Sequence, residues 1–322
     1  MPAAIGRSAL HFDRLLSNVA VEAWASTDDQ FIADMVLPSV TVDKQSDYYA
    51  IIEKDGFFRE WDAERAPKTS ANKIQWSVSS TMFLARNYAL AGENALEDIA
   101  TADDQFSIRE NTVKAVVLGL KRAREIRVAG LVTSGTNVGS YVALSGATKW
   151  SAVDSADILG QVNSAHAFIR SQTGLVPNVA IIDWDTLQVA RRSTRLLDLF
   201  KYTQGGELPV DMFMRNVLKV DKMHVGQGVK NVAAQGKSAS MSNIWGNNCL
   251  LAYVAPSLAG KQTQTFGLTF EWTPPIYPAN FGVQRTVYNG AGETKVEVIE
   301  AGHYQAHQVV ARELSYLISA TI

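Results

Sequence analysis

One short stretch of the chain carries residue types that could bind a phosphate. Gly236-Lys237-Ser238 resembles the end of a phosphate-binding loop, in which backbone amides curl around the phosphate and the lysine reaches it. Such a loop needs a glycine five residues before Gly236, but the sequence has Asn231 at that position, and no clear helix follows Ser238. We therefore interpret this stretch as a surface loop.

Two further stretches imitate known catalytic or cofactor motifs. Gly226-Gln227-Gly228 follows a predicted strand but lacks the third glycine of a dinucleotide-binding turn, since Asn231 stands in its place. Ser70 and Lys73 have the spacing of acyl-transferring enzymes, in which the lysine must lie one helical turn from the serine. Pro67 precedes this pair in a loop between predicted strands, and the chain has no Lys-Thr-Gly partner. Neither stretch predicts a catalytic site.

Two pairs of residues have spacings that could bind a metal ion. His303 and His307 lie four residues apart, but VEVIEAGHYQAHQVV predicts strand and turn, so they are interpreted as ordinary polar residues. Asp183 and Asp185 could bind a hard cation, although an N-cap pair for the following helix is favoured. We therefore expect no catalytic, cofactor-binding or metal-binding residue, no cofactor, and no enzyme activity.

Charge and cysteine content limit the class of protein further. The net charge of the 322 residues is −2, so no overall basic field would recruit nucleic acid. The Arg191-Arg192-x-x-Arg195 cluster could contact phosphates or an acidic partner, but a solvated helix face is the simpler interpretation. Cys249 is the only cysteine, which excludes an internal disulfide and is typical of a reducing cytoplasm. The N-terminus lacks the apolar core of an export signal, and no window has the eighteen uninterrupted apolar residues of a membrane span.

The first half of the chain predicts an arm, an anchor, a long hairpin and a long helix. Residues 1–30 are weakly amphipathic, with one short helix expected around Leu10 to Val19, and FIADMVLPSVTV (31–42) is an apolar anchor interrupted by Pro38. Strands are expected at 48–53 and 74–84, on either side of an excursion with ten charged residues that is too long for a tight turn. A capping box at Ser107 and Glu110 predicts the start of a helix that runs to Thr133, roughly 25 residues and about 37 Å long.

The second half predicts an α/β module followed by strands. After a Gly/Ser/Thr-rich boundary at 136–154, Asp154 or Ser155 could cap a helix that stops at Gly174. Further helices are expected at 186–192 and 210–218, and strands at 178–182, 220–225 and 248–254. The remainder predicts strands at 264–272, 282–288 and 294–299, with a hairpin signal at Asn289-Gly290.

This order of parts resembles the major capsid proteins of tailed phages with the HK97-like fold. The segments that carry the resemblance cover most of the chain: FIADMVLPSVTV, DYYAIIEKDGFFREW…NKIQWSVSSTMF, the long helix with its lead-in, PNVAIIDWDTLQVARR, GNNCLLAYVAP and QTFGLTFEW. The resemblance implies an α+β fold with an N-terminal arm and anchor (1–42), an extended β-hairpin or E-loop (43–85), a peripheral domain with a spine helix (86–150), an α/β axial domain (151–262) and C-terminal β segments that return to the peripheral domain (263–322).

The resemblance also implies a function. Copies of such a protein assemble as hexamers and pentamers into an icosahedral shell that contacts packaged double-stranded DNA non-specifically, together with a portal protein and, in some cases, a decoration protein. The chain is expected in the virion, and in the host cytoplasm during assembly, with no membrane contact. Two alternatives remain: an encapsulin-type compartment shell of the same fold, and an enzyme that binds a nucleotide near Gly236–Ser238 in the 155–255 module.

Two departures from the family pattern concern assembly. No long segment precedes the arm, so a separate scaffolding protein is expected rather than a fused one. Some family members crosslink a loop lysine to an asparagine of a neighbouring subunit. Lys54, Lys68 and Lys73 lie in the corresponding region, but no partner asparagine or catalytic carboxylate can be matched, and noncovalent assembly is expected.

Overall fold

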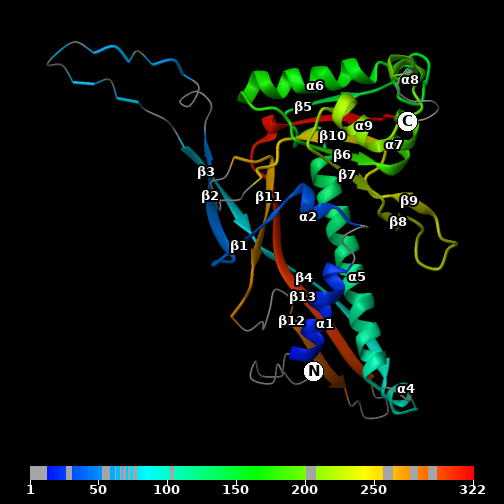
Figure 1. The fold of residues 1–322 in the computed structure, drawn as a ribbon. Helices are drawn as coiled ribbons and strands as arrows, with labels where there is room; N and C mark the ends of the chain where they lie inside the picture. The colour runs from blue at the N-terminus through cyan, green and yellow to red at the C-terminus, as the bar shows by residue number, and fades with distance from the viewer. Residues whose placement is uncertain are drawn as a thin grey trace.

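The computed structural model describes the chain at residues 13–26, 31–52, 59–61, 63–65, 67, 70–71, 73–74, 78–101, 105–200, 208–256, 264–275, 282–288 and 296–322. Figure 1 shows an elongated molecule with a sheet and helix α6 at one end, and the long helix α5 running from there toward the other end. A hairpin projects from one flank. Within the described ranges, no helix is both long and apolar enough to cross a lipid bilayer.

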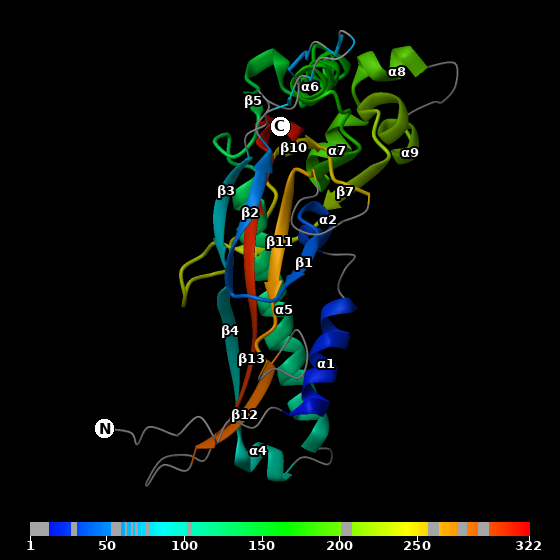
Figure 2. The same ribbon diagram turned by 90° about the vertical axis from the view of Figure 1, so that its left-hand side faces the viewer.

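The first five-stranded sheet occupies the elongated part of the molecule. Its order is β1-β11-β13-β12, and β4 pairs with the other edge of β13. The strands are β1 (Ser39–Val42), β4 (Arg86–Ala95), β11 (Gly267–Trp272), β12 (Gly282–Tyr288) and β13 (Val296–Val309). All pairings are antiparallel except that of β1 with β11. Helices α1 (Arg14–Ala25) and α5 (Gln105–Val132) pack on one face of this sheet (Figure 2).

The second five-stranded sheet has the order β5-β14-β10-β6-β7. Its strands are β5 (Ser140–Ala143), β6 (Val179–Asp183), β7 (Lys222–Gly226), β10 (Asn248–Ala252) and β14 (Ser315–Ser319). Alternate residues along β6 point into two different cores: Ala180 and Ile182 pack with α6, whereas Val179 and Ile181 pack with α5 and the anchor. Because a core covers each face of the second sheet at β6, all five residues of this strand are buried.

The remaining elements are short or paired in two-stranded sheets. Strands β2 (Ser46–Ile52) and β3 (Val78–Leu84) form one antiparallel pair, and β8 (Val229–Asn231) and β9 (Met241–Asn243) form another. The helices are α2 (Ala33–Val36), α4 (Leu96–Thr101), α6 (Ile158–Thr173), α7 (Trp184–Ala190), α8 (Thr194–Phe200) and α9 (Val210–Met212), the last followed by a π-helical stretch at Phe213–Leu218.

Most predicted elements are confirmed, but several boundaries are wrong. Helix α5 has 28 residues, about 42 Å, and begins at Gln105, so Ser107 lies inside the helix and is not its N-cap. Asp157, rather than Asp154 or Ser155, caps α6, which ends at Gly174 in a left-handed conformation with φ of 70° as expected. Helix α8 was not predicted. Asn289-Gly290 lie outside the described residues, while β12 and β13 pair antiparallel on either side.

Two strands of the second sheet come from segments far from its other strands in the sequence. β5, from the 86–150 segment, and β14, from the 263–322 segment, both pair within the second sheet. The register places Leu317 of β14 opposite Leu250 of β10, so the end of the chain completes the core of the α/β module and does not return to the first sheet. Strand pairing between segments this distant in sequence leaves no local signal, so the sequence does not predict it.

Candidate functional site

Glu125 of α5 lies at the buried junction of three parts of the chain. Its side chain accepts hydrogen bonds from the backbone amides of Ile32 at 3.1 Å and Ala33 at 2.9 Å, and from the indole Nε1 of Trp245 at 2.6 Å. The first amides of a helix have no acceptor within the helix, so Glu125 supplies one to the start of α2. Burial raises the pKa of the Glu125 carboxyl, although the three donors oppose that rise.

The preceding residue, Arg124, ties the anchor to the same helix. Arg124 is 1% exposed and forms ion pairs with Asp34 of α2 and, at 3.5 Å, with Glu271 of β11. Its guanidinium also donates to Ser39 Oγ of β1 at 3.3 Å, and Ser39 Oγ donates to Glu271 Oε1 at 3.0 Å. Two consecutive residues of α5 therefore hold both halves of the anchor, before and after Pro38.

Trp24, at the end of α1, covers the cationic side of this junction. Its ring lies under the charged groups of Lys121 and Arg124, with centroid distances of 5.3 and 5.5 Å, and its backbone oxygen accepts from Lys121 Nζ. The ring of His303 meets it edge to face with centroids 5.5 Å apart. Aromatic faces stabilise buried cations through the ring quadrupole, so α1 shields two charges that the helix buries against the sheet.

His303 and His307 both point to this cationic region from β13. Burial, followed by the positive charges of Arg124 and Arg127, lowers the pKa of each imidazole to about 3. Arg127 lies over the ring of Tyr88 at 3.6 Å. The two histidines are on one continuous strand without the predicted turn, and His303 is buried whereas His307 is half-buried.

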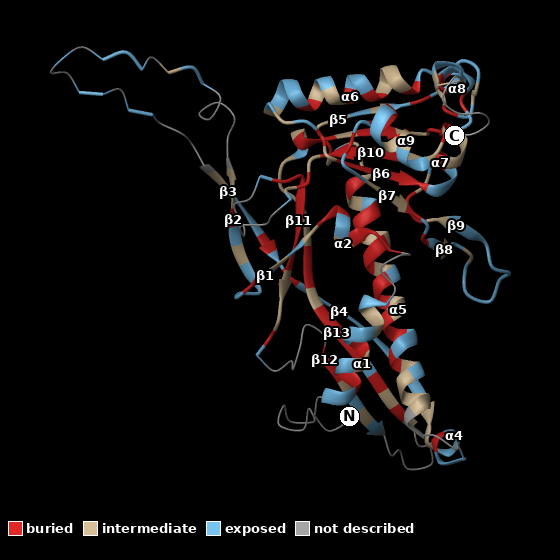
Figure 3. Ribbon diagram, in the orientation of Figure 1, coloured by how far each residue is buried: buried red, intermediate tan, exposed pale blue. Residues whose placement is uncertain are grey.

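The β2–β3 hairpin has one face packed on the body and one face open. Phe83 stacks on Phe270 of β11 with ring centroids 4.2 Å apart, and Tyr49 lies 5.5 Å from the same ring. On the other face Tyr48 and Met82, which are cross-strand partners, are 62% and 55% exposed. Figure 3 shows the described strands of the hairpin buried where they meet the sheet and exposed along the rest. A two-stranded hairpin is marginally stable alone, so the packing of Phe83 and Tyr49 on Phe270 holds this hairpin on the body.

The structure places the sequence-predicted chemical residues apart from one another. Gly236 lies in the exposed connection between β8 and β9, and Asp183 is the N-cap of α7, accepting from the amide of Asp185 at 3.2 Å. Burial raises the pKa of Asp183 to about 6, and Asn243 bridges the two carboxylates. Among the described residues, no group of three or more histidine, cysteine, aspartate or glutamate side chains could hold a metal ion.

The other predicted residues have structural roles or lie outside the description. Arg191, just after α7, donates to Gln188 and to the backbone of Leu208, and Arg195 of α8 donates to the backbone of Ser155. The arginines therefore do not line a single helix face. The thiol of Cys249 is fully buried, which raises its pKa to about 12. Of the lysines considered for crosslinking, Lys73 is exposed, while Lys54 and Lys68 lie outside the described residues. Ser70 is also exposed.

The residues of the junction were missed by the sequence analysis, although a signal was present. The buried stripe of α5 runs through Val113, Val117 and Leu120, and the same helical spacing continues at Arg124 and Val128. A charged residue in register with an apolar stripe predicts a buried ion pair. Trp245 and Asp34 gave no such signal, because their approach to α5 depends on the tertiary fold.

The chain is similar to proteins of phages along most of its length. It is 26% identical over 293 residues to the major capsid protein of Pseudomonas phage JBD67, and the aligned residues cover 87% of this chain and 91% of the relative. The major capsid protein of Burkholderia phage BcepMu is 25% identical over 267 residues, covering 81% of this chain and 82% of the relative. No protein-family model matches.

Solved structures show the same architecture. A phage-related protein from Bordetella bronchiseptica superposes with a TM-score of 0.72 at 18% identity, covering 97% of this chain and 98% of the other. The capsid protein in the structure of cyanophage P-SCSP1u gives a TM-score of 0.54 at 14% identity, covering 88% and 86%. These similarities show the fold, a mixed helix and sheet architecture that resembles the HK97-like structures of phage capsids.

Proposed function

We propose that this chain is the major capsid protein of a tailed double-stranded DNA phage, and that its copies assemble as hexamers and pentamers into an icosahedral shell around the genome. The observation that carries the proposal is the similarity to two phage major capsid proteins over more than four fifths of the chain. The HK97-like architecture supports it independently, because the structural neighbours include phage capsids.

Contacts within the subunit support a physical task for each proposed part. Helix α5 is the proposed spine, because it contacts the anchor, the first sheet and the second sheet along its length. The β2–β3 hairpin is the proposed E-loop, whose exposed Tyr48 and Met82 would be covered by a neighbouring subunit. The second sheet with its helices forms the proposed axial domain, with β5 and β14 added to the segment predicted from the sequence.

The proposed partners follow from the same function. Copies of the chain contact one another in the shell, a separate scaffolding protein guides assembly, a portal protein occupies one vertex, and a decoration protein is a further possible partner. Contact with DNA would be non-specific, in keeping with the net charge of −2. The proposed location is the virion after assembly in the host cytoplasm, and the proposed role is structural, without catalysis. An encapsulin-type shell is not favoured, because both curated relatives are named as phage capsid proteins.

Sedimentation velocity of the purified protein, with and without its scaffolding protein, tests the proposal. We expect a fast-sedimenting boundary of the size of closed shells, or boundaries of five- and six-subunit rings. A single boundary of the 35.1 kDa monomer at high concentration under both conditions would contradict the proposed function.

A further inference from the structure

A layer of polar side chains lies between α5 and the first sheet, with an apolar core on either side of it. The face of β13 under α5 begins with Ile299 and Ala301, which belong to an apolar cluster with the first half of the helix. Alternate residues of a strand share a face, so this face continues with His303, Gln305 and His307. Beyond them, the last turns of α5 pack with the anchor in a second apolar cluster. The side chains between the two clusters form the polar layer: Arg124 and Arg127 of α5, Glu271 of β11, and His303, Gln305 and His307 of β13.

The hydrogen bonds of Thr269 fix the position of the proton on His307. Thr269 Oγ1 lies 3.0 Å from the carbonyl oxygen of Leu37 and 3.0 Å from Nδ1 of His307. A hydroxyl has one proton and a carbonyl can only accept, so Thr269 donates to Leu37, and Nδ1–H of His307 donates to Thr269. A neutral imidazole carries a single N–H, and burial together with Arg124 and Arg127 keeps this ring neutral by lowering its pKa to about 3. Nε2 of His307 is therefore a hydrogen-bond acceptor.

Several buried atoms of the polar layer lack a hydrogen-bond partner in the part of the chain that the structure describes. They are Nε2 of His307, Nε of Arg124, and Nε and Nη2 of Arg127. The other nitrogens of Arg124 bind side chains of α2, β1 and β11, whereas the guanidinium of Arg127 stacks on the ring of Tyr88 at 3.6 Å. Buried polar groups are rarely left without a partner in native proteins, so the acceptor and the donors of this layer require one.

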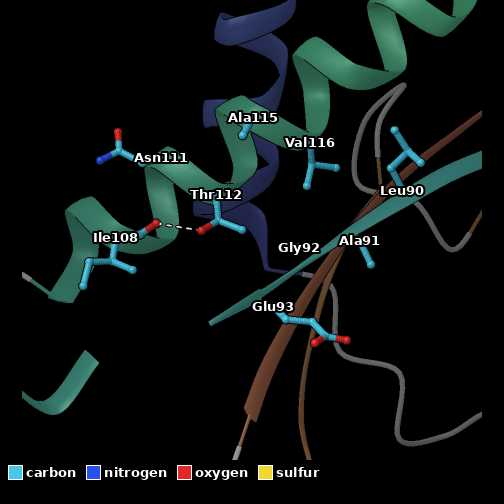
Figure 4. A pocket seen from close by; sticks show the side chains of 9 residues that line it. All are labelled: Leu90, Ala91, Gly92, Glu93, Ile108, Asn111, Thr112, Ala115 and Val116. Atoms are coloured by element: carbon cyan, nitrogen blue, oxygen red, sulfur yellow. Dashed lines mark hydrogen bonds between the residues drawn. The ribbon is translucent and has the colours of Figure 1, made fainter. Parts of the chain in front are cut away.

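Contacts on either side of the polar layer set the distance between α5 and the sheet. Toward the start of the helix, Figure 4 shows Thr112 beside Gly92 of β4, where a Cβ atom would lie 2.5 Å from Thr112 Cγ2. The helix lies as close to the strand there as a glycine allows. Toward its other end, Glu125 accepts from the backbone amides at the start of α2, which holds the helix on the anchor. Within this frame the guanidinium groups form no direct hydrogen bond with the imidazole Nε2, so a partner common to both must be a small molecule.

The chemistry of these atoms selects water as that molecule. Nε2 of His307 needs a donor, whereas the N–H groups of Arg124 and Arg127 need an acceptor. An inorganic anion would meet the N–H groups but not the lone pair of Nε2, and a metal cation would be repelled by the two guanidinium groups. The charge of Arg124 is paired with Asp34 and Glu271, so it does not call for a further anion. Water both donates and accepts, and a buried water typically makes about three hydrogen bonds to polar groups that have no other partner.

We propose that the polar layer holds buried water, which donates to Nε2 of His307 and accepts from the guanidinium groups of Arg124 and Arg127. The hydrogen bonds from His307 through Thr269 end at Leu37, so this water connects α5, β13 and the anchor. A buried water of this kind is part of the structure of each subunit. The inference is therefore independent of the proposed function and holds for free subunits and assembled copies alike.

An experimental structure that resolves ordered waters tests the site directly. We expect a density peak within about 2.7–3.2 Å of Nε2 of His307 and of at least one guanidinium nitrogen of Arg124 or Arg127. Crystals soaked in bromide should show no anomalous signal at this peak, because an anion is excluded. The lack of a peak between these atoms, or a peak that bromide replaces, would overturn the inference and leave the proposed function intact.

Two measurements in solution test the tautomer and the water separately. Nitrogen-15 NMR near neutral pH should show a proton on Nδ1 of His307 and none on Nε2, and a proton on Nε2 would remove the acceptor on which the inference rests. Oxygen-17 relaxation dispersion detects internal waters with long residence times. His307→Phe keeps an aromatic ring without an acceptor, and His224→Phe makes the same change at a half-buried position of β7, outside the polar layer.

The two variants should differ in their internal water. We expect His307→Phe to lose dispersion amplitude that the wild type and His224→Phe retain. Equal amplitudes in the two variants would contradict a water held by His307. If His307→Phe does not fold, the density and the tautomer of the wild-type protein decide the question on their own.

Discussion

Glu125 and Trp245, 120 residues apart in the sequence, are joined by a buried hydrogen bond of 2.6 Å from the indole Nε1 to the carboxylate. Because the same carboxylate accepts from the amides of Ile32 and Ala33, one side chain of α5 connects the anchor to the segment that leads into β10 of the second sheet. The position of the hairpin that follows the anchor therefore depends on a junction in the centre of the subunit.

Removing the Glu125 carboxylate is expected to destabilise the subunit strongly. Glu125→Ala leaves three buried donors without their acceptor, and each such donor costs about 1–3 kcal/mol. We expect the free energy of unfolding, measured by urea titration, to fall by about 3 kcal/mol or more. The control is Glu110→Ala on the same helix, which removes a solvent-exposed ion pair with Lys114 and should have a far smaller effect. Equal losses in the two variants would show that the junction has no special role.

The two faces of the hairpin should respond differently to truncation. Phe83→Ala removes a fully buried ring stacked on Phe270 and should cost about 3–4 kcal/mol of subunit stability. Met82→Ala, next to it on the open face, should leave the unfolding midpoint unchanged and weaken assembly, as followed by light scattering. If Met82→Ala assembled at the wild-type concentration, the open face would not be an intersubunit contact.

The stability of the subunit should fall on mild acidification because of His303 and His307. Their pKa values are lowered from 6.5 to about 3, so the unfolded chain binds more protons than the folded chain between these limits. The stability is fully present above about pH 6.5, and each histidine contributes a loss on the order of 1.4 kcal/mol per pH unit below it. The raised pKa of Asp183, about 6, acts in the opposite direction and offsets part of this loss.

Unfolding titrations between pH 7.5 and 4.5 would detect the two histidines. The double variant His303→Gln/His307→Gln should show a much flatter dependence of the unfolding free energy on pH than the wild type. The same slope in both proteins would mean that other groups control the acid response.

Deleting the excursion between the strands of the hairpin separates folding from assembly. Removal of about residues 56–73 takes away a segment whose described residues lie outside the buried core, so we expect a folded subunit with an unchanged circular dichroism spectrum. The shortened chain should not form stable shells in electron micrographs. Unfolding of the variant, or normal assembly, would show that the excursion is not the intersubunit loop.

Local sequence patterns predicted where helices and strands lie better than they predicted which of these elements pack or pair with one another. The apolar spacing of α5 and the alternation in β2 and β3 were sufficient to find these elements, because each packs one regular face on the body. Two other features could not be predicted: the pairing of β14 with β10 and the ion pair between Arg124 and Asp34. Both join residues far apart in the sequence, and local hydrophobic periodicity carries no information about such contacts. The pairing of β4 with β13 could not be predicted either, since the sequence does not show which strands lie side by side.

Electron microscopy of the purified wild-type protein at high concentration, alone and with its scaffolding protein, tests the central claim most directly. The account predicts closed shells of uniform size, or rings of five and six subunits. Images that show only dispersed monomers under both conditions would contradict it.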